Sequence, residues 1–114
     1  MPSPDAFLPL THVVYHVLLS LAHGSSHGYG ILKDVEERTE GRLQLQAGTL
    51  YTAIRRLRED GLVEEVDRPA GADERRRYYG LTRAGQRVLH AESRRLEELV
   101  RLARDARVLP SRPG

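Results

Sequence analysis

Residues 48–65, GTLYTAIRRLREDGLVEE, limit the possible folds of this chain most strongly, because a helical pattern runs directly into a strand pattern. At about 100° per residue, the apolar positions share one side of a helix: Leu50, Ala53, Ile54 and Leu57. The opposite side carries Gly48, Thr52, Arg55 and Arg56, with Thr49 and Tyr51 on the flanks. Gly61 ends the helix, and the β-prone run LVEEV follows at once.

Two further helices are predicted before this segment. Thr11 is a suitable N-cap for a helix ending at Gly24, whose apolar residues follow i, i+3, i+4 spacing: Val13, Val14, Val17, Leu18 and Leu21. GSSHG then indicates a turn, and Ser26 is the expected N-cap of a second helix that stops at Gly41. RLQLQ is a connector to the third helix. Residues 1–9 contain three prolines and little periodicity, which indicates an extended arm.

After the third helix, LVEEV and RRRYYGL are separated by the breaker-rich DRPAGADE, a pattern typical of a hairpin with a projecting loop. Tyr79 is expected to pack inward. Thr82 is the predicted N-cap of a last helix that reaches about Val108. The chain is therefore predicted to be mainly α with a small β-hairpin. Its predicted parts are an arm at 1–9, a winged helix-turn-helix domain at 10–81, a long C-terminal dimerisation helix at 82–109 and a flexible tail at 110–114.

The last helix repeats apolar residues at heptad spacing, with Glu92 as a defect in the seam. The helix can bury these residues against its own domain or against a second copy of the chain. The heptad spacing favours the second copy, so a homodimer is expected. The predicted dimerisation residues are Leu89, Leu96, Leu99, Val100 and Ala103.

The charge distribution indicates a polyanionic partner. The formal net charge is only +2, but arginines cluster in IRRLR and ERRRYY. A helix in the DNA major groove must bury one side and offer the other to bases, and a neighbouring hairpin loop reaches the adjacent backbone or minor groove. Arginine can bond both acceptors of a guanine edge, and threonine can contact thymine. We therefore predict double-stranded DNA as the partner of these residues: His27, Tyr29, Gly48, Thr49, Tyr51, Thr52, Arg55, Arg56, Arg68, Arg75, Arg76 and Arg77.

Three motifs, HGYGI, GTLYTAIRRLREDGLVEE and DERRRYYGLTRAGQRVL, together resemble the PadR family of bacterial transcriptional regulators. The resemblance runs from about Leu8 to about Leu109. It implies a dimeric winged-helix repressor that binds an inverted-repeat operator and is released by a small-molecule or other signal. GTLY would open the recognition helix and RRRYY would form the returning wing strand. Many relatives have proline directly after GTLY, where this chain has Thr52, and the chain resembles the short subgroup without a larger C-terminal helical domain.

Other functions are disfavoured. The chain has no Cys, which excludes thiolate sites, and no run of the roughly 20 apolar residues that a membrane span needs. No arrangement of nucleophile and base is evident, so we expect neither an enzyme nor a cofactor, and we place the protein in the cytoplasm. His12 and His16 are four residues apart but lack an evident third ligand for a metal. The main alternative function is a winged-helix module whose basic face binds an acidic protein.

Overall fold

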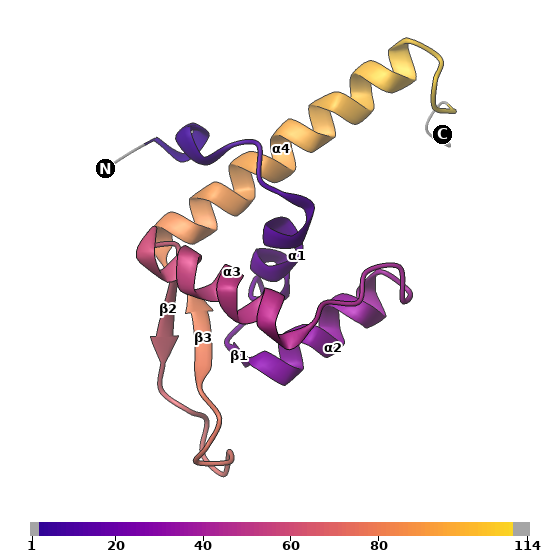
Figure 1. Ribbon diagram of the computed structural model, residues 1–114. Coiled ribbons are helices and arrows are strands. Elements are labelled where there is room, and N and C mark those ends of the chain that lie inside the picture. The colour runs from indigo at the N-terminus through magenta and orange to yellow at the C-terminus, as the bar shows by residue number, and fades with distance from the viewer. Residues whose placement is uncertain (1–2, 111–114) are drawn as a thin grey trace.

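The computed structural model describes residues 3–110 and contains a small helical bundle beside a three-stranded sheet (Figure 1). A 3₁₀ helix, η1 (Pro4–Phe7), precedes α1 (His12–Ser20). The remaining elements are β1 (Ser26–His27), α2 (Gly28–Arg38), α3 (Ala47–Glu59), β2 (Val63–Val66), β3 (Tyr78–Leu81) and α4 (Arg83–Asp105). The sheet is antiparallel with strand order β1-β3-β2. This arrangement confirms the predicted winged helix-turn-helix with a long C-terminal helix.

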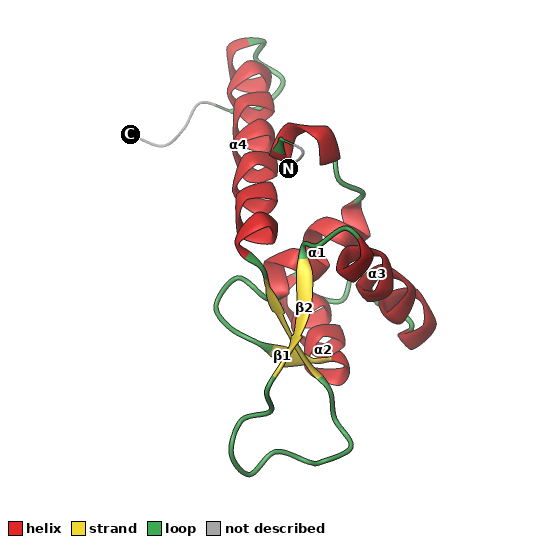
Figure 2. Cartoon of the chain, turned by 90° about the vertical axis from the view of Figure 1, so that its left-hand side faces the viewer, coloured by secondary structure: helices red, strands yellow, loops and turns green. Residues whose placement is uncertain are grey.

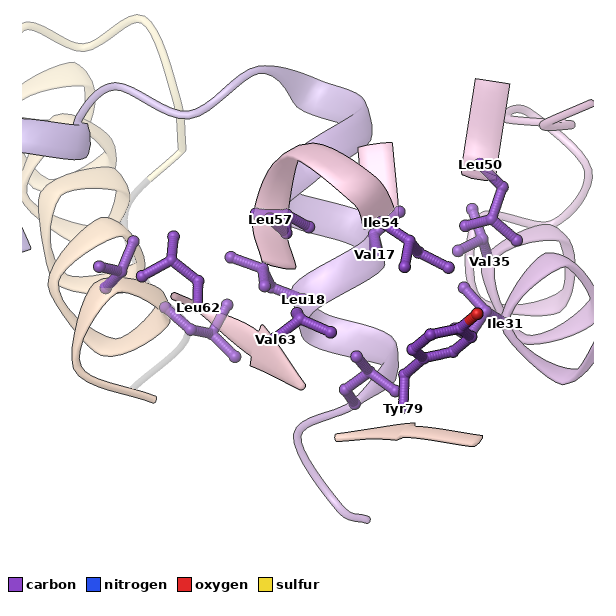
Figure 3. Close-up of a cluster of buried hydrophobic side chains, with 13 residues drawn as sticks. Val17, Leu18, Ile31, Val35, Leu50, Ile54, Leu57, Leu62, Val63 and Tyr79 are labelled. Carbon is purple, nitrogen blue, oxygen red and sulfur yellow. The ribbon is translucent and has the colours of Figure 1, made fainter. Parts of the chain in front are cut away.

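The core lies where α1, α2 and α3 meet the sheet (Figure 3). The buried side of α3 is the one that the periodicity predicts, with Leu50, Ile54 and Leu57 at most 3% exposed. Tyr79 is also buried, as expected, and points from β3 toward Ile31 of α2. The amphipathic side of α3 is thus fixed by packing, and its polar side faces outward.

Helix α4 packs on this core only through its first turns. Val88 and Leu89 are buried, whereas the second half of the helix extends away from the domain (Figure 1). The Cα radius of gyration is 15.8 Å, above the roughly 13 Å expected for a compact chain of this length. The 90° view places the far end of α4 and the loop between β2 and β3 at opposite ends of the molecule (Figure 2).

The N-terminal segment differs from the predicted extended arm. Residues Pro4–Phe7 form η1, which packs beside α4 (Figures 1 and 2). The backbone N–H of Leu10 donates to Glu92 Oε2 at 2.7 Å. Glu92 is 1% exposed and pairs with Arg95, so it is an anchor for the N-terminal segment rather than a defect in a seam.

The start of α2 also differs from the prediction. His27, not Ser26, is the N-cap, because His27 Nδ1 accepts a hydrogen bond from the N–H of Gly30 at 3.1 Å. Ser26 and His27 pair with Tyr79 and Tyr78 of β3, so part of the expected turn is a strand that completes the sheet. Helix α2 ends at Arg38, and Glu40 and Gly41 follow with positive φ.

The boundaries after β2 need two smaller corrections. Strand β3 begins at Tyr78, so Arg75, Arg76 and Arg77 belong to the loop and not to the returning strand. Thr82 is the N-cap of α4, as predicted, but the helix ends at Asp105 rather than near Val108. Most of the predicted tail, residues 111–114, lies outside the described residues, as do the first two residues of the predicted arm.

No helix within residues 3–110 combines the length and the apolar character that crossing a membrane requires.

Candidate nucleic-acid interface

The outward side of α3 is a continuous polar surface. The residues predicted for this side are all exposed: Gly48, Thr49, Tyr51, Thr52, Arg55 and Arg56. Because Leu50, Ile54 and Leu57 anchor the opposite side, the orientation of this surface relative to the domain is fixed. No side chain caps the first turn of α3, where Gln46 is the N-cap residue.

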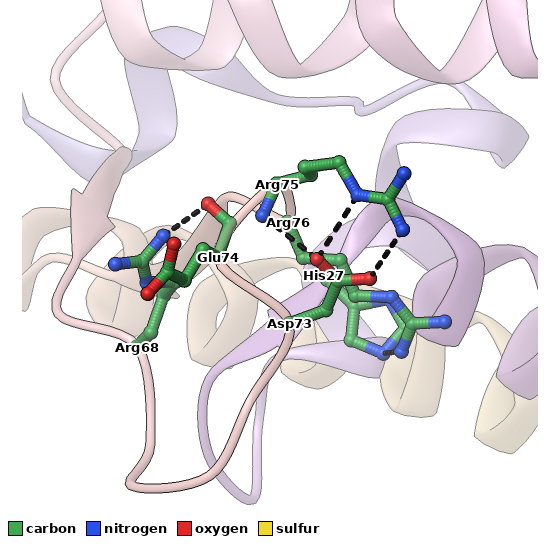
Figure 4. A network of polar contacts seen from close by, with 6 residues as sticks. All are labelled: His27, Arg68, Asp73, Glu74, Arg75 and Arg76. Carbon is green, nitrogen blue, oxygen red and sulfur yellow. Dashed lines mark hydrogen bonds and ion pairs between the residues drawn. The ribbon is translucent and has the colours of Figure 1, made fainter.

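The loop of residues 67–77, here called the wing loop, carries four arginines with different surroundings. Figure 4 shows Arg68, Arg75 and Arg76. Arg75 donates from Nη2 to Asp73 Oδ2 at 3.2 Å, and the Arg75 backbone N–H donates to Asp73 Oδ1 at 2.9 Å. The Arg68 guanidinium donates to the backbone carbonyl of Glu74, across the loop. Arg77 lies 3.9 Å from the Glu65 carboxylate. These contacts stabilise the conformation of the wing loop, and the two carboxylates partly neutralise the charges of Arg75 and Arg77.

Asp73 shapes the wing loop, and the sequence patterns did not single it out. Hydrogen bonds from the Arg75 side chain and backbone lower the pKa of Asp73 below its ordinary value. The carboxylate therefore stays ionised and fixes the turn that precedes the three arginines. An Asp two residues before the Arg run, in a loop rich in Pro and Gly, is the sequence signal for such a turn.

His27 links the wing loop to α2. Its Nε2 lies 3.0 Å from Arg76 Nη1, while Nδ1 caps the helix. Tyr78 meets the ring edge-on at a centroid distance of 5.2 Å, and the Tyr29 ring is parallel to it at 6.4 Å. Burial, and then the charge of Arg76, lowers the pKa of His27, which favours the neutral form of the ring.

These contacts bring half of the predicted DNA-binding residues together around one pocket of about 230 Å³, which also includes Gly28 and Tyr79. The predicted residues at the pocket are His27, Tyr29, Tyr51, Arg75, Arg76 and Arg77. A Cβ at Gly28 would overlap the hydroxyl of Tyr51, so the glycine lets the Tyr51 side chain lie against the start of α2. The pocket therefore joins α2, α3 and the wing loop.

A second, more open pocket beside α3 and β2 has a different charge. It is lined by Arg55, Arg58, Glu59, Val63, Glu64 and Glu65. The three carboxylates repel a polyanion at this place. The basic surface therefore follows the outer side of α3 and the wing loop, and not β2.

The two histidines considered as metal ligands lie apart from this surface. His12 and His16 are in edge-to-face contact at 4.6 Å, and burial, together with the charges of His12 and Arg38, lowers the pKa of His16. Within residues 3–110, no three His, Cys, Asp or Glu side chains are grouped so that they can hold a metal ion.

The predicted dimerisation residues fall into two groups. Leu89 is 8% exposed and belongs to the core of its own protomer. Leu99 and Val100 are exposed, and Leu96 and Ala103 are partly exposed on the projecting half of α4. On the opposite side of this half, Arg101 pairs with Glu98 at 3.0 Å and with Asp105 at 2.8 Å. The projecting half is thus amphipathic, and its apolar side is left largely uncovered by the described residues 3–110.

Comparisons with known proteins agree with this architecture. The model of the transcriptional regulator PadR-like family matches residues 17–91, more than half of the chain. The chain is 32% identical over 97 residues to the transcriptional regulator Rv3488 of Mycobacterium tuberculosis, covering 79% of this chain and 77% of the relative.

Solved structures share the fold. A transcriptional regulator from Clostridium thermocellum has a TM-score of 0.70 and 26% identity, with 92% of this chain and 97% of that chain covered. PadR of Bacillus subtilis in complex with operator DNA has a TM-score of 0.62 and 22% identity, with 71% of this chain and 46% of that chain covered.

The matched family and these relatives are transcriptional regulators, which confirms the prediction that the chain is not an enzyme. The motifs, the winged fold and the family match together lead to one conclusion: the chain belongs to the PadR-like family of transcriptional regulators.

Proposed function

We propose that the protein is a sequence-specific DNA-binding repressor that acts as a homodimer on an inverted-repeat operator. The observation that carries this proposal is the exposed Thr and Arg side of α3 next to the arginine-bearing wing loop. A helix anchored on one side and polar on the other is the form that enters a major groove, and Arg55 and Arg56 are suited to guanine edges or nearby phosphates.

The dimer part of the proposal is supported by the shape of the molecule. The projecting half of α4 offers Leu96, Leu99 and Val100 to a second copy, at the end of the molecule opposite the wing loop (Figure 2). A twofold pairing there leaves both α3 helices uncovered. In such a dimer the two recognition helices are expected about 34–36 Å apart, one turn of duplex.

Repression, cytoplasmic location and release by a small-molecule or other signal rest on membership in a family of transcriptional regulators. The operator-bound PadR of Bacillus subtilis, which shares the fold, supports operator binding in the same way. The order of the elements and the clustering of arginines support DNA as the partner more directly.

Selection of bound duplexes from a random pool tests the proposal. We expect enrichment of a sequence with twofold symmetry and half-sites about 10 base pairs apart. Affinity should fall steeply between 50 and 200 mM salt, because several phosphates are neutralised and counterions are released. A shallow salt dependence with no enriched sequence would support the alternative, a module that binds an acidic protein.

Arg56→Ala tests the role of α3 within the same experiment. If Arg56 reads a guanine, the substitution should cost about 1–3 kcal/mol on the selected duplex and relax specificity at one position. Arg58→Ala, which removes the same charge two residues later beside Glu59, is the matched control and should have a smaller effect. Equal losses for Arg56→Ala on selected and random duplexes would assign Arg56 to a phosphate.

A further inference from the structure

The contact between His27 and Arg76 joins two hydrogen-bond donors. His27 Nδ1 accepts the N–H of Gly30, so the proton of the neutral ring must be on Nε2. A guanidinium has only donors. The 3.0 Å approach of Arg76 Nη1 to Nε2 therefore satisfies neither group.

The geometry does not let the ring avoid this conflict by changing its protonation. A second proton on Nδ1 would break the N-cap bond to Gly30 and would add a positive charge beside Arg76. The alternative tautomer would likewise place two donors, Nδ1–H and the Gly30 N–H, against each other. The edge-on contact with Tyr78 also restricts rotation of the ring. The structure thus presents Nε2–H and the guanidinium at one fixed point.

Arg76 differs in this respect from the other arginines of the wing loop. Arg75, Arg68 and Arg77 each have an oxygen partner, namely Asp73, the Glu74 carbonyl and Glu65. For the Arg76 guanidinium, no oxygen from residues 3–110 is in hydrogen-bonding geometry, and the His27 ring is its contact. An acceptor placed beside both groups would satisfy both donors, and the surrounding arginines favour one with negative charge.

We propose that His27 and Arg76 together hold one phosphate group, supplied by the DNA backbone, with the α2 N-cap fixing the ring so that Nε2–H donates to it. A phosphate oxygen has lone pairs for both donors, and the pocket of about 230 Å³ has room for the group. The inference rests on the proposed function. It makes His27 a neutral phosphate ligand and not a cation, and it couples the wing loop to α2 through the bound phosphate.

A double-mutant cycle on the 114-residue chain tests this coupling, with affinity measured by fluorescence anisotropy on the selected duplex and on a random duplex. His27→Asn retains a favoured N-cap, but its shorter side chain does not carry a donor to the position of Nε2, so it should weaken both duplexes roughly tenfold, the scale of one hydrogen bond to a charged group. The salt slope should stay unchanged, because neither side chain is charged. Arg76→Ala should also cost roughly tenfold and reduce the salt slope by about 0.9.

Coupling is the decisive result. If both residues hold the same phosphate, the double variant should lose far less than the hundredfold product of the single effects. A duplex with one neutral methylphosphonate, placed at each position of the half-site in turn, should show one position that weakens the wild type and has no effect on the double variant. The proposal would be overturned if the double variant lost the full product of the two single losses of affinity, or if His27→Asn bound DNA as tightly as the wild type.

Two controls distinguish a shared DNA phosphate from a folding defect and from a free phosphate ligand. His27→Ala, which removes the cap as well, should lower the melting temperature, whereas His27→Asn should not, so a loss of affinity in His27→Asn is not a folding defect. Titration with inorganic phosphate, followed by the ¹⁵N shift of His27 Nε2, tests a free phosphate compound as the ligand. A saturating response with unchanged duplex affinity in both single variants would overturn the DNA assignment. Failure of the wild type to bind any duplex at 50 mM salt would instead refute the proposed function.

Discussion

Gly85 lies where the first turn of α4 crosses the backbone of Leu62. A Cβ at Gly85 would come under 3.0 Å from the Leu62 carbonyl oxygen, which is backbone and has little freedom to move. Thr82 bonds to the same backbone segment: its N–H donates to the Leu62 carbonyl oxygen at 3.1 Å, and its hydroxyl donates to the Gly61 carbonyl oxygen at 2.6 Å. Because glycine has no side chain, the first turn of α4 can pack directly against the backbone that follows α3.

We expect Gly85→Ala to lower the free energy of unfolding by about 1–3 kcal/mol or more, because overpacking here must displace backbone. Urea unfolding followed by circular dichroism measures the change. Gly48→Ala is the control: a Cβ at Gly48 meets nothing within 4 Å, and alanine is favoured over glycine in a helix by up to about 1 kcal/mol. Equal stability of Gly85→Ala and wild type would show that the α4 backbone at Gly85 and the Leu62 backbone have room to move apart.

At the scale of elements, Glu92 connects α4 with the N-terminal segment. Hydrogen bonds from the Arg95 guanidinium and from the Leu10 N–H lower the pKa of Glu92, although burial opposes the shift. The folded state therefore binds fewer protons at Glu92 than the unfolded state. The stabilisation is complete above the unfolded pKa of about 4.5 and is lost as the pH falls through the lower folded pKa.

Glu92→Gln should lower the free energy of unfolding at pH 7 by about 1–3 kcal/mol, because a buried bond to a charged group is lost. It should also flatten the loss of stability below pH 4.5. Urea unfolding at a series of pH values measures both effects. Glu98→Gln is the matched control, since Glu98 makes a similar pair with Arg101 but is exposed, and it should change stability far less. A pH dependence identical to wild type would exclude Glu92 as the anchor.

At the scale of the whole molecule, the elongated shape separates two surfaces. The wing loop lies at one end and the apolar side of the projecting half of α4 at the other (Figures 1 and 2). Leu99 is 48% exposed, which is unusual for a leucine at heptad spacing unless a partner covers it. Pairing through this half leaves the candidate DNA-binding surface accessible.

Leu99→Glu should convert a dimer into a folded monomer, because it places a charge in the apolar seam. Sedimentation equilibrium gives the mass, and circular dichroism tests whether the fold is retained. Arg101→Glu introduces the same residue on the opposite, ion-paired side and should remain a dimer. A Leu99→Glu variant that is still dimeric would mean that the copies pair elsewhere.

Features that depend on neighbouring residues were predictable from the sequence. The buried side of α3, the hairpin and the Thr82 cap follow from periodicity, β-propensity and a hydrogen bond over three residues, and the structure confirms each. The exposure of Arg55 and Arg56 follows from the same periodicity. Local physics determines these features because their partners are at most a few positions away.

The tertiary structure alone decided the roles that depend on distant partners. Leu10 and Glu92 are 82 positions apart, and His27 and Arg76 are 49 apart, so no local pattern connects either pair. Two further features depend on distant partners. Ser26 pairs with β3, so His27 and not Ser26 is the N-cap of α2, and Leu89 packs into the core of its own protomer. The sequence by itself determined which sides of the helices are apolar and where the arginines gather. Only the packing of remote segments decided which polar groups find partners. It places the donors of His27 and Arg76 against each other, with no acceptor between them from residues 3–110.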